Sequence, residues 1–185
     1  DLGGGLELAM HCDGLVIAPP GPGKDGTIKP YLIGLPEAGL QICPGWGGTN
    51  LLAARMDPAE AMQRTCAGKP MTSDEAIAAK LVDDCASSQG ELIAAAKSWL
   101  KSHRNIAASR RDGQPSRWIG RDGVRNACLK AYSQQIDSLG LADPGRSCMK
   151  AIDAGLDQGW MAALKVEREE LNRLRHAPAG KNAIS

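Results

Sequence analysis

The sequence predicts an α/β protein whose first half mixes short strands with helices and whose second half is mostly helical. Two brief apolar runs, residues 15–18 and 31–33, predict buried strands in the first half. Residues 89–103 instead carry apolar side chains at helical spacing, which indicates an amphipathic helix. The chain has 185 residues, which is enough for one domain with a hydrophobic core.

Capping residues locate the predicted helices of the first half. Asp57, Pro58 and Glu60 suit the N-cap, first and third positions of one helix, and Gly68 suits its end. Thr72 begins the next helix in the same way, with an acidic residue three positions later. The predicted helices span residues 4–12, 49–56, 58–66 and 73–80, with a glycine- and proline-rich loop at 19–26 and a short extended segment at 81–82.

The second half is predicted as a series of helices with one long connection. The connection, residues 104–121, is rich in Arg, Ser, Gly and Asp, and Trp118 and Ile119 would anchor it on the core. The last helix should carry Glu169 and Arg173 as an i,i+4 pair on its outer side. Its predicted inward residues are Trp160, Leu164, Leu171 and Leu174. The predicted helices span residues 89–103, 124–136, 143–152 and 160–176.

Composition excludes several classes of function. The net charge is +1 and no basic stripe with interleaved aromatic residues appears, so a nucleic-acid partner is not expected. No apolar run approaches the roughly 20 residues that a membrane helix needs. Six scattered cysteines without a C-x-x-C pair indicate reduced thiols and a cytoplasmic location. Three histidines far apart in sequence form no ligand motif, so no metal site is expected.

The stretch that organises the chain is Gly3–Gly5, followed at once by a helical run that contains Glu7. Glycine lacks a Cβ, so a substrate can lie directly against the backbone N–H groups. A helix that begins here offers unpaired N–H donors, which are the parts of an oxyanion hole, with a carboxylate beside them. The alternative is a glycine turn before a surface helix, because a short glycine motif alone is weak evidence.

A second stretch adds another carboxylate. Pro36 fixes its own φ and biases Leu35 towards extended geometry, so Glu37 should sit on a defined turn. Gly45 and the glycine pair at 47–48 then open another helix.

Three segments occur in a characteristic order: GGG-x-E-L-A-x-x-C-D at residues 3–13, G-x-P-E at 34–37 and P-G-x-G-G-T at 44–49. Together they resemble the enoyl-CoA hydratase/isomerase (crotonase) family. The resemblance is strong over residues 2–84 and looser over 85–185. The later part resembles the hydratase domain of multifunctional fatty-acid oxidation proteins.

The resemblance implies a crotonase-like ββα-spiral core followed by a mostly helical region. Residues 1–84 would form the C-terminal part of the catalytic core. Residues 85–185 would complete the domain and supply oligomer contacts. The family has a substantial segment before its GGG-x-E motif, so the core is expected to be incomplete at its N-terminus. Family members commonly form trimers or paired trimers, which implies a homo-oligomer here, a trimer or a hexamer.

The resemblance also implies a reaction, the addition of water across the double bond of a 2-enoyl-CoA thioester. Two positioned carboxylates can share the proton transfers if one is ionised and the other protonated. These carboxylates fall on Glu7 and Glu37, and either could be the base. One backbone donor to the thioester oxygen falls on Gly4, and the other would come from the upstream segment. Coenzyme A enters as part of the substrate, and no further cofactor is implied.

Gly45 and Trp46 fall at the expected substrate pocket. A small residue is usual between the glycines of the family motif, so Trp46 departs from the pattern. Its bulk would shorten the acyl pocket, or its ring would fill core. The arginines of residues 104–121 could meet the phosphates of coenzyme A, although a solvated loop is the simpler alternative.

Other functions remain open at this point. The chain could be an enoyl-CoA isomerase or another acyl-CoA enzyme of the family, or a non-catalytic subunit with the crotonase fold. Retention of both Glu7 and Glu37 favours the hydratase. Without the second oxyanion donor, the fragment alone is expected to be inactive.

Overall fold

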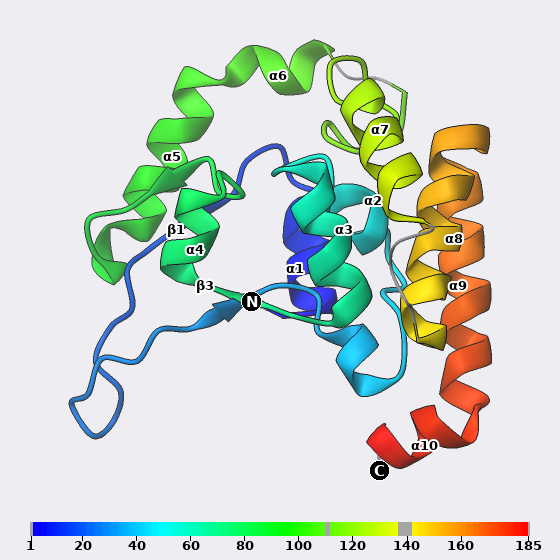
Figure 1. Ribbon diagram of the computed structural model, residues 1–185. Helices are drawn as coiled ribbons and strands as arrows, with labels where there is room; N and C mark the ends of the chain where they lie inside the picture. The colour runs from blue at the N-terminus through cyan, green and yellow to red at the C-terminus, as the bar shows by residue number, and fades with distance from the viewer. Residues whose placement is uncertain (1, 110–111, 137–141, 185) are drawn as a thin grey trace.

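The computed structural model describes residues 2–109, 112–136 and 142–184, so Arg110 and Arg111 of the predicted connection lie outside the described residues. Helix α1 lies near the centre of the molecule (Figure 1). Helices α2, α3, α7, α8 and α9 lie to one side of it, and β1, α4 and α5 lie to the other. The elements are α1 (Gly4–Met10), β1 (Val16–Ile17), β2 (Leu32–Ile33), η1 (Glu37–Leu40), α2 (Gly48–Leu52), α3 (Pro58–Ala67), β3 (Met71–Thr72), α4 (Ser73–Ala78), β4 (Asp84–Cys85), η2 (Gln89–Glu91), α5 (Leu92–Ser102), α6 (Arg104–Ser109), α7 (Arg125–Gln135), α8 (Asp143–Gln158), α9 (Trp160–His176) and α10 (Pro178–Ile184).

The strands form two separate two-stranded pairs among the described residues. Strand β1 runs parallel to β4, with Val16 opposite Asp84, and β2 runs antiparallel to β3, with Ile33 opposite Met71. Both strands predicted in the first half are therefore confirmed, although each keeps only two residues. The loop predicted at residues 19–26 follows β1 and projects from the molecule (Figure 1).

The predicted caps are confirmed. The Asp57 side chain accepts a hydrogen bond from the Glu60 N–H at 2.9 Å, and Gly68 ends α3 with a φ of +63°. Thr72 and Glu75 form a reciprocal capping box at the start of α4. These contacts join residues three positions apart, so the local sequence is enough to place both helix starts.

One hydrophobic cluster joins the two halves of the chain. It contains Leu6 and Met10 of α1 together with Ile152 of α8 and Trp160 of α9. Helices α8 and α9 pack along each other, and α3 packs against α7 and α8. The helical second half therefore covers one side of the mixed first half, as Figure 1 shows.

The helical half differs from prediction in four places. Helix α6 occupies the first residues of the predicted 104–121 connection, and α10 follows a segment predicted only to end α9. Helix α8 continues beyond residue 152 to Gln158 because Gly155 stays helical and leaves room for the Asn50 side chain; Gly159, with a φ of +94°, ends it. The predicted pair of Glu169 with Arg173 is wrong, because Arg173 binds two other carboxylates.

The predicted connection is anchored on the core, and two of its arginines form ion pairs. Trp118 and Ile119 are buried at 6% and 0% exposure, which confirms that they anchor the segment on the core. Arg117 forms an ion pair with Asp83, and Arg121 forms one with Asp112. Both guanidinium groups therefore already have carboxylate partners within the chain.

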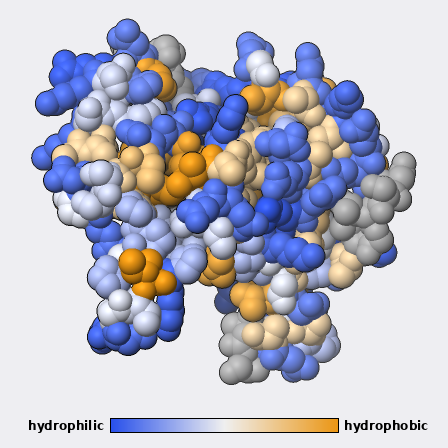
Figure 2. Space-filling model, turned by 60° about the vertical axis from the view of Figure 1, so that its left-hand side comes forward, coloured by the Kyte–Doolittle hydropathy of each residue, from blue (hydrophilic) through white to orange (hydrophobic). Residues whose placement is uncertain are grey.

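No helix within the described ranges is long and apolar enough to cross a membrane. Figure 2 shows the side of the molecule that lies on the left of Figure 1. Apolar residues gather across the middle of this face, and hydrophilic residues surround them.

Candidate active site

Glu7 is held against a glycine turn by two backbone N–H groups. It lies in the first turns of α1 and is only 3% exposed. Its Oε1 accepts hydrogen bonds from the N–H of Trp46 and from the N–H of Gly48, both at 2.8 Å. An N–H can only donate, so this oxygen is fixed as an acceptor.

Glycine at position 48 is what allows this approach. A Cβ on Gly48 would stand 2.8 Å from Glu7 Oε1 and 3.0 Å from the Leu35 side chain. The G-G-T segment thus accommodates the carboxylate of a helix 41 positions earlier in the sequence. The neighbouring Gly47 has a φ of +96°, a region that residues with a side chain rarely adopt.

Glu37 approaches the same end of α1 from the Pro36 turn. It begins the short helix η1 and is 8% exposed. A Cβ on Gly3 would stand 2.7 Å from Glu37 Oε1, and Gly3 has a φ of +57°, so glycine is required there on two grounds. Glu37 Oε2 is buried without a hydrogen-bond partner among the described residues.

The pKa of Glu37 is raised to about 7. Burial is the largest cause, and the negative charge of Glu7 adds to it, while a backbone hydrogen bond opposes the rise. A carboxyl with this pKa can hold or release a proton near neutral pH, which is the property that acid–base catalysis requires. The first and second sequence motifs thus bring two carboxyl groups into electrostatic contact.

Gly4 lies at the first residue of α1 and is exposed. No heavy atom lies within 4 Å of the position that a Cβ on Gly4 would occupy. A side chain at this position would therefore meet open space beyond the helix's own backbone.

Gly45 and Trp46 have separate environments. A Cβ on Gly45 would stand 2.4 Å from the Leu171 side chain, so this glycine is required for packing against α9. Trp46 is 63% exposed, so the prediction that its ring fills core is wrong. Its carbonyl oxygen lies 2.9 Å from His11 Nε2. The backbone of Trp46 holds Glu7, and its ring faces outward.

The sequence analysis missed Glu167, a fully buried carboxyl on α9. Glu167 accepts hydrogen bonds from the Gly47 N–H at 2.5 Å, the Thr49 N–H at 3.0 Å and the Thr49 hydroxyl at 2.6 Å. Burial raises its pKa to about 7, and the charge of Glu7 adds to the rise. A signal was present, because position 167 falls between Leu164 and Leu171 on the inward side of the predicted helix.

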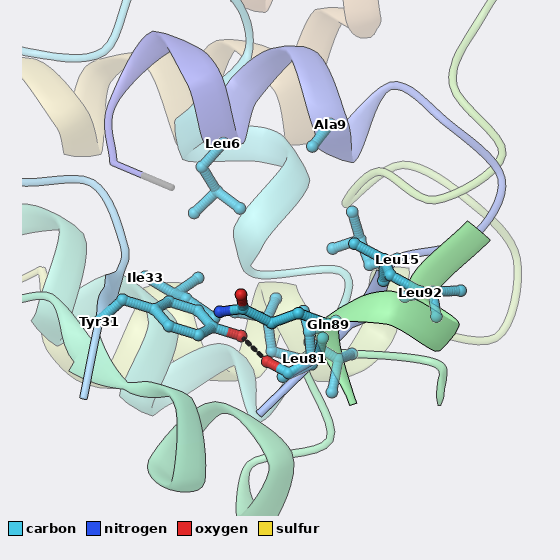
Figure 3. A pocket seen from close by; sticks show the side chains of 12 residues that line it. Leu6, Ala9, Leu15, Tyr31, Ile33, Leu81, Gln89 and Leu92 are labelled. Carbon is cyan, nitrogen blue, oxygen red and sulfur yellow. Dashed lines mark hydrogen bonds between the residues drawn. The ribbon is translucent and has the colours of Figure 1, made fainter. Parts of the chain in front are cut away.

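A cavity lies elsewhere, beside Leu6 and Ala9 of α1. It has a volume of about 550 Å³ and neither glutamate lines it. Figure 3 shows Leu6 and Ala9 pointing into it from α1, opposite Tyr31 and Gln89, with the Tyr31 hydroxyl donating to the Ala18 carbonyl at 2.7 Å. The cavity and the two glutamates are therefore separate features of the molecule. Among the described residues no group of His, Cys, Asp and Glu side chains could hold a metal ion.

Comparisons with known proteins show the family and the fold of the chain. No family model matches the chain. The chain is 31% identical over a 189-residue alignment to the "Glyoxysomal fatty acid beta-oxidation multifunctional protein MFP-a" of Cucumis sativus, which covers 99% of this chain and 24% of that protein. It is 38% identical over 96 residues to a "Probable enoyl-CoA hydratase" of Bacillus subtilis, covering 52% of this chain and 33% of that protein.

A solved structure shows the same fold. The carnitinyl-CoA hydratase from Mycobacterium avium superposes with a TM-score of 0.56 at 18% identity, covering 99% of this chain and 54% of that one. The chain spans about a quarter to a third of the length of the two relatives. The fold is therefore crotonase-like, a partial α/β core followed by a helical region. Sequence and fold together place this chain in the enoyl-CoA hydratase/isomerase (crotonase) superfamily.

Proposed function

We propose that the protein carrying this chain is an enoyl-CoA hydratase that adds water across the double bond of 2-enoyl-CoA thioesters. The observation that carries the proposal is the meeting of Glu7 and Glu37, which come from two separate motifs to one end of α1. Both are buried, and the charge of one acts on the other. The named relatives include a probable enoyl-CoA hydratase, which supports the same reaction class.

The two carboxyl groups take opposite roles in this mechanism. Glu37, with a pKa of about 7, carries a proton near neutral pH and delivers it to the α carbon of the substrate. Glu7, fixed as an acceptor by two N–H donors, takes a proton from water as the hydroxyl oxygen bonds to the β carbon. Glu7 thus gains the proton that Glu37 loses, and a return transfer through solvent resets the pair.

The thioester oxygen gains negative charge in this step and needs donors. We assign one to the N–H of Gly4, the first residue of α1, where an added Cβ would meet open space. The exposed Trp46 ring would border the acyl chain, while Gly45 supports that turn through its contact with Leu171. Proton transfers of this kind need only the thioester and the two carboxyls, so the proposal includes no cofactor beyond the coenzyme A of the substrate.

Three further assignments belong to the same proposal. Residues 1–84 would be the C-terminal part of the catalytic core and residues 85–185 the region that completes it and makes the oligomer contacts. The protein would be a homo-oligomer, a trimer or a hexamer. We propose a cytoplasmic location on cysteine usage alone, and the glyoxysomal name of the Cucumis relative is the reason to test it by localising a tagged protein.

The test is hydration of crotonyl-CoA by the full-length protein and by its Glu7→Gln and Glu37→Gln variants. Each substitution should lower kcat by about 10²–10⁴-fold, because each removes one acid–base group. Both variants should keep the wild-type circular dichroism spectrum. Turnover near the wild-type level in either variant would contradict the two-carboxylate mechanism, and a wild-type protein without acyl-CoA activity would favour a non-catalytic crotonase-fold subunit.

A further inference from the structure

Four successive backbone N–H groups divide between two carboxylates. Those of Trp46 and Gly48 donate to Glu7 of α1, and those of Gly47 and Thr49 donate to Glu167 of α9. The segment of residues 46–49, here called the shared turn, therefore lies between two carboxyl groups from opposite ends of the chain. Its orientation relative to α1 depends on both.

Glu167 is buried and hydrogen-bonded in a way that can fix the shared turn. It is 0% exposed, and each of its oxygens accepts at least one hydrogen bond from the turn. The Thr49 hydroxyl that donates to it accepts from the Asn50 amide at 2.9 Å, and the same amide nitrogen lies 3.1 Å from the Ala151 carbonyl. A hydrogen-bonded chain thus connects the turn to α8 as well as to α9.

The other polar contacts of the turn fall on its carbonyl groups: His11 Nε2 lies 2.9 Å from the Trp46 carbonyl, and the Gly47 carbonyl accepts from the N–H groups that begin helix α2. Gly47 has a φ of +96° and no side chain, and its backbone lies against the Trp160 ring, from which an added Cβ would stand 2.5 Å. The Trp46 ring is exposed. Glu167 therefore accepts the N–H hydrogen bonds of the turn that Glu7 does not accept.

We propose that Glu167 is a positioning residue for catalysis: it holds the shared turn so that the N–H groups of Trp46 and Gly48 fix the Glu7 carboxylate. The inference rests on the proposed hydratase function, which uses Glu7 as the acceptor of a proton from water. Glu167 itself touches no reacting atom in this scheme. It acts on the reaction through the turn.

The first test is Glu167→Gln in the full-length protein. A glutamine cannot accept from all three donors, because its amide NH₂ would face the Gly47 N–H or the Thr49 donors. We expect kcat for crotonyl-CoA to fall by about 10²-fold with KM little changed, because a catalytic group misplaced by roughly 1 Å lowers the rate by about this factor. Glu170→Gln is the matched control on the same helix, since Glu170 binds Ser147, Lys150 and Arg173 and not the turn. Glu170→Gln should leave kcat unchanged.

The second test is a double-mutant cycle with Glu7→Gln. If Glu167 acts through Glu7, the Glu167 substitution should cause little further loss of kcat once Glu7 has been replaced. If instead the loss of kcat in the double variant equals the product of the two single losses, Glu167 supports the fold in general, and the proposal is overturned.

A third measurement is independent of activity. The NMR amide-proton chemical shifts of Trp46 and Gly48 should move upfield in Glu167→Gln and stay in place in Glu170→Gln. Unchanged shifts would overturn the positioning role even if the enzyme is a hydratase. Shifts that move in a protein without hydratase activity would contradict only the proposed function.

If Glu167→Gln does not fold, Thr49→Val provides a second test, because it removes one donor to Glu167 while keeping the side-chain shape. This variant should move the same two resonances, and Thr49→Ser should restore them.

Discussion

The two sides of helix α1 carry different groups: a buried carboxyl on one side and apolar side chains that line a cavity on the other. One side carries Glu7, which is buried against the backbone of the shared turn and lies close enough to Glu37 to raise its pKa. The other side carries Leu6 and Ala9, which line the 550 Å³ cavity with mostly apolar neighbours (Figure 3). The cavity thus lies beside the less reactive side chains.

The difference shows what each side is suited to do. An apolar cavity gains free energy when an apolar group fills it, but its walls move no protons. The glutamate side has a carboxyl with a pKa of about 7 and, on a second carboxyl, two backbone N–H donors. Chemistry in this molecule is therefore expected where polar groups are buried and oriented.

A pair of matched substitutions would test this comparison most strongly. Gly48→Ala should lower kcat for crotonyl-CoA by about 10²-fold, because the new Cβ would stand 2.8 Å from Glu7 Oε1 and displace the carboxylate. Ala9→Leu adds a larger side chain on the opposite side of the same helix and should leave kcat unchanged. Steady-state kinetics with crotonyl-CoA measures both.

The reverse pattern, with a large loss in Ala9→Leu and none in Gly48→Ala, would place the chemistry in the cavity. A thermal unfolding scan serves as the control. Both variants should stay folded, since the atom that Gly48→Ala displaces is the far end of a flexible side chain.

The second prediction concerns pH and sharpens the electrostatic part of the comparison. In the folded state the Glu37 carboxyl keeps its proton up to a pKa of about 7, whereas an ordinary exposed glutamate releases its proton near 4.5. The folded state therefore binds more protons than the unfolded state between these values, and the free energy of unfolding falls as pH rises through this window. Glu167, with a pKa also raised to about 7, acts in the same direction.

Glu37→Gln removes one of these two contributions. Relative to wild type, this variant should gain on the order of 1–3 kcal/mol in unfolding free energy between pH 5 and pH 8, from about 1.36 kcal/mol per pKa unit. Urea unfolding of both proteins across this range measures it. Parallel stability profiles would mean that the Glu37 carboxyl is not buried as a neutral group.

The smallest expected effect is that of Trp46→Ala. Because the ring is 63% exposed, its loss should change the free energy of unfolding by no more than about 0.5 kcal/mol. If the ring borders the acyl chain, the variant should accept longer substrates, with at most about 0.8 kcal/mol gained per added methylene. The measurement is kcat/KM against acyl length for both proteins. An identical length profile would remove Trp46 from the substrate pocket.

Local signals in the sequence were enough for much of the fold. The contacts of Asp57 with Glu60 and of Thr72 with Glu75 lie within one helical turn, and both predicted starts are confirmed. The extra helix α6 was missed because it begins at Arg104 with no capping residue, and α10 was missed because Pro178, at its first position, was taken only as part of the end of α9. The outer pair of Glu169 with Arg173 failed because Asp143, 30 positions away, offers Arg173 a bidentate partner instead.

The candidate site was predicted only in part. The family motifs identified Glu7, Glu37 and the glycines, but the contact of Glu7 with Trp46 spans 39 positions and follows from no spacing rule. The direction of the Trp46 ring depends on tertiary packing in the same way, and of the two alternatives for this ring the one that it fills core is wrong. Glu167 was overlooked although its helical position is inward, because burial of a carboxyl is acceptable only with donors that the sequence does not reveal.

The alternating donors of the shared turn also constrain how this protein can evolve. Neighbouring N–H groups serve opposite carboxylates, so deleting or inserting a single residue between Pro44 and Asn50 would turn the donors of Glu7 towards Glu167 and those of Glu167 towards Glu7. The side chain at position 46 can vary, as the exposed indole shows, while the number of residues cannot. Length variation among related chains should therefore accumulate in the projecting loop at 19–26, and an alignment of such chains should run without gaps through positions 44–50.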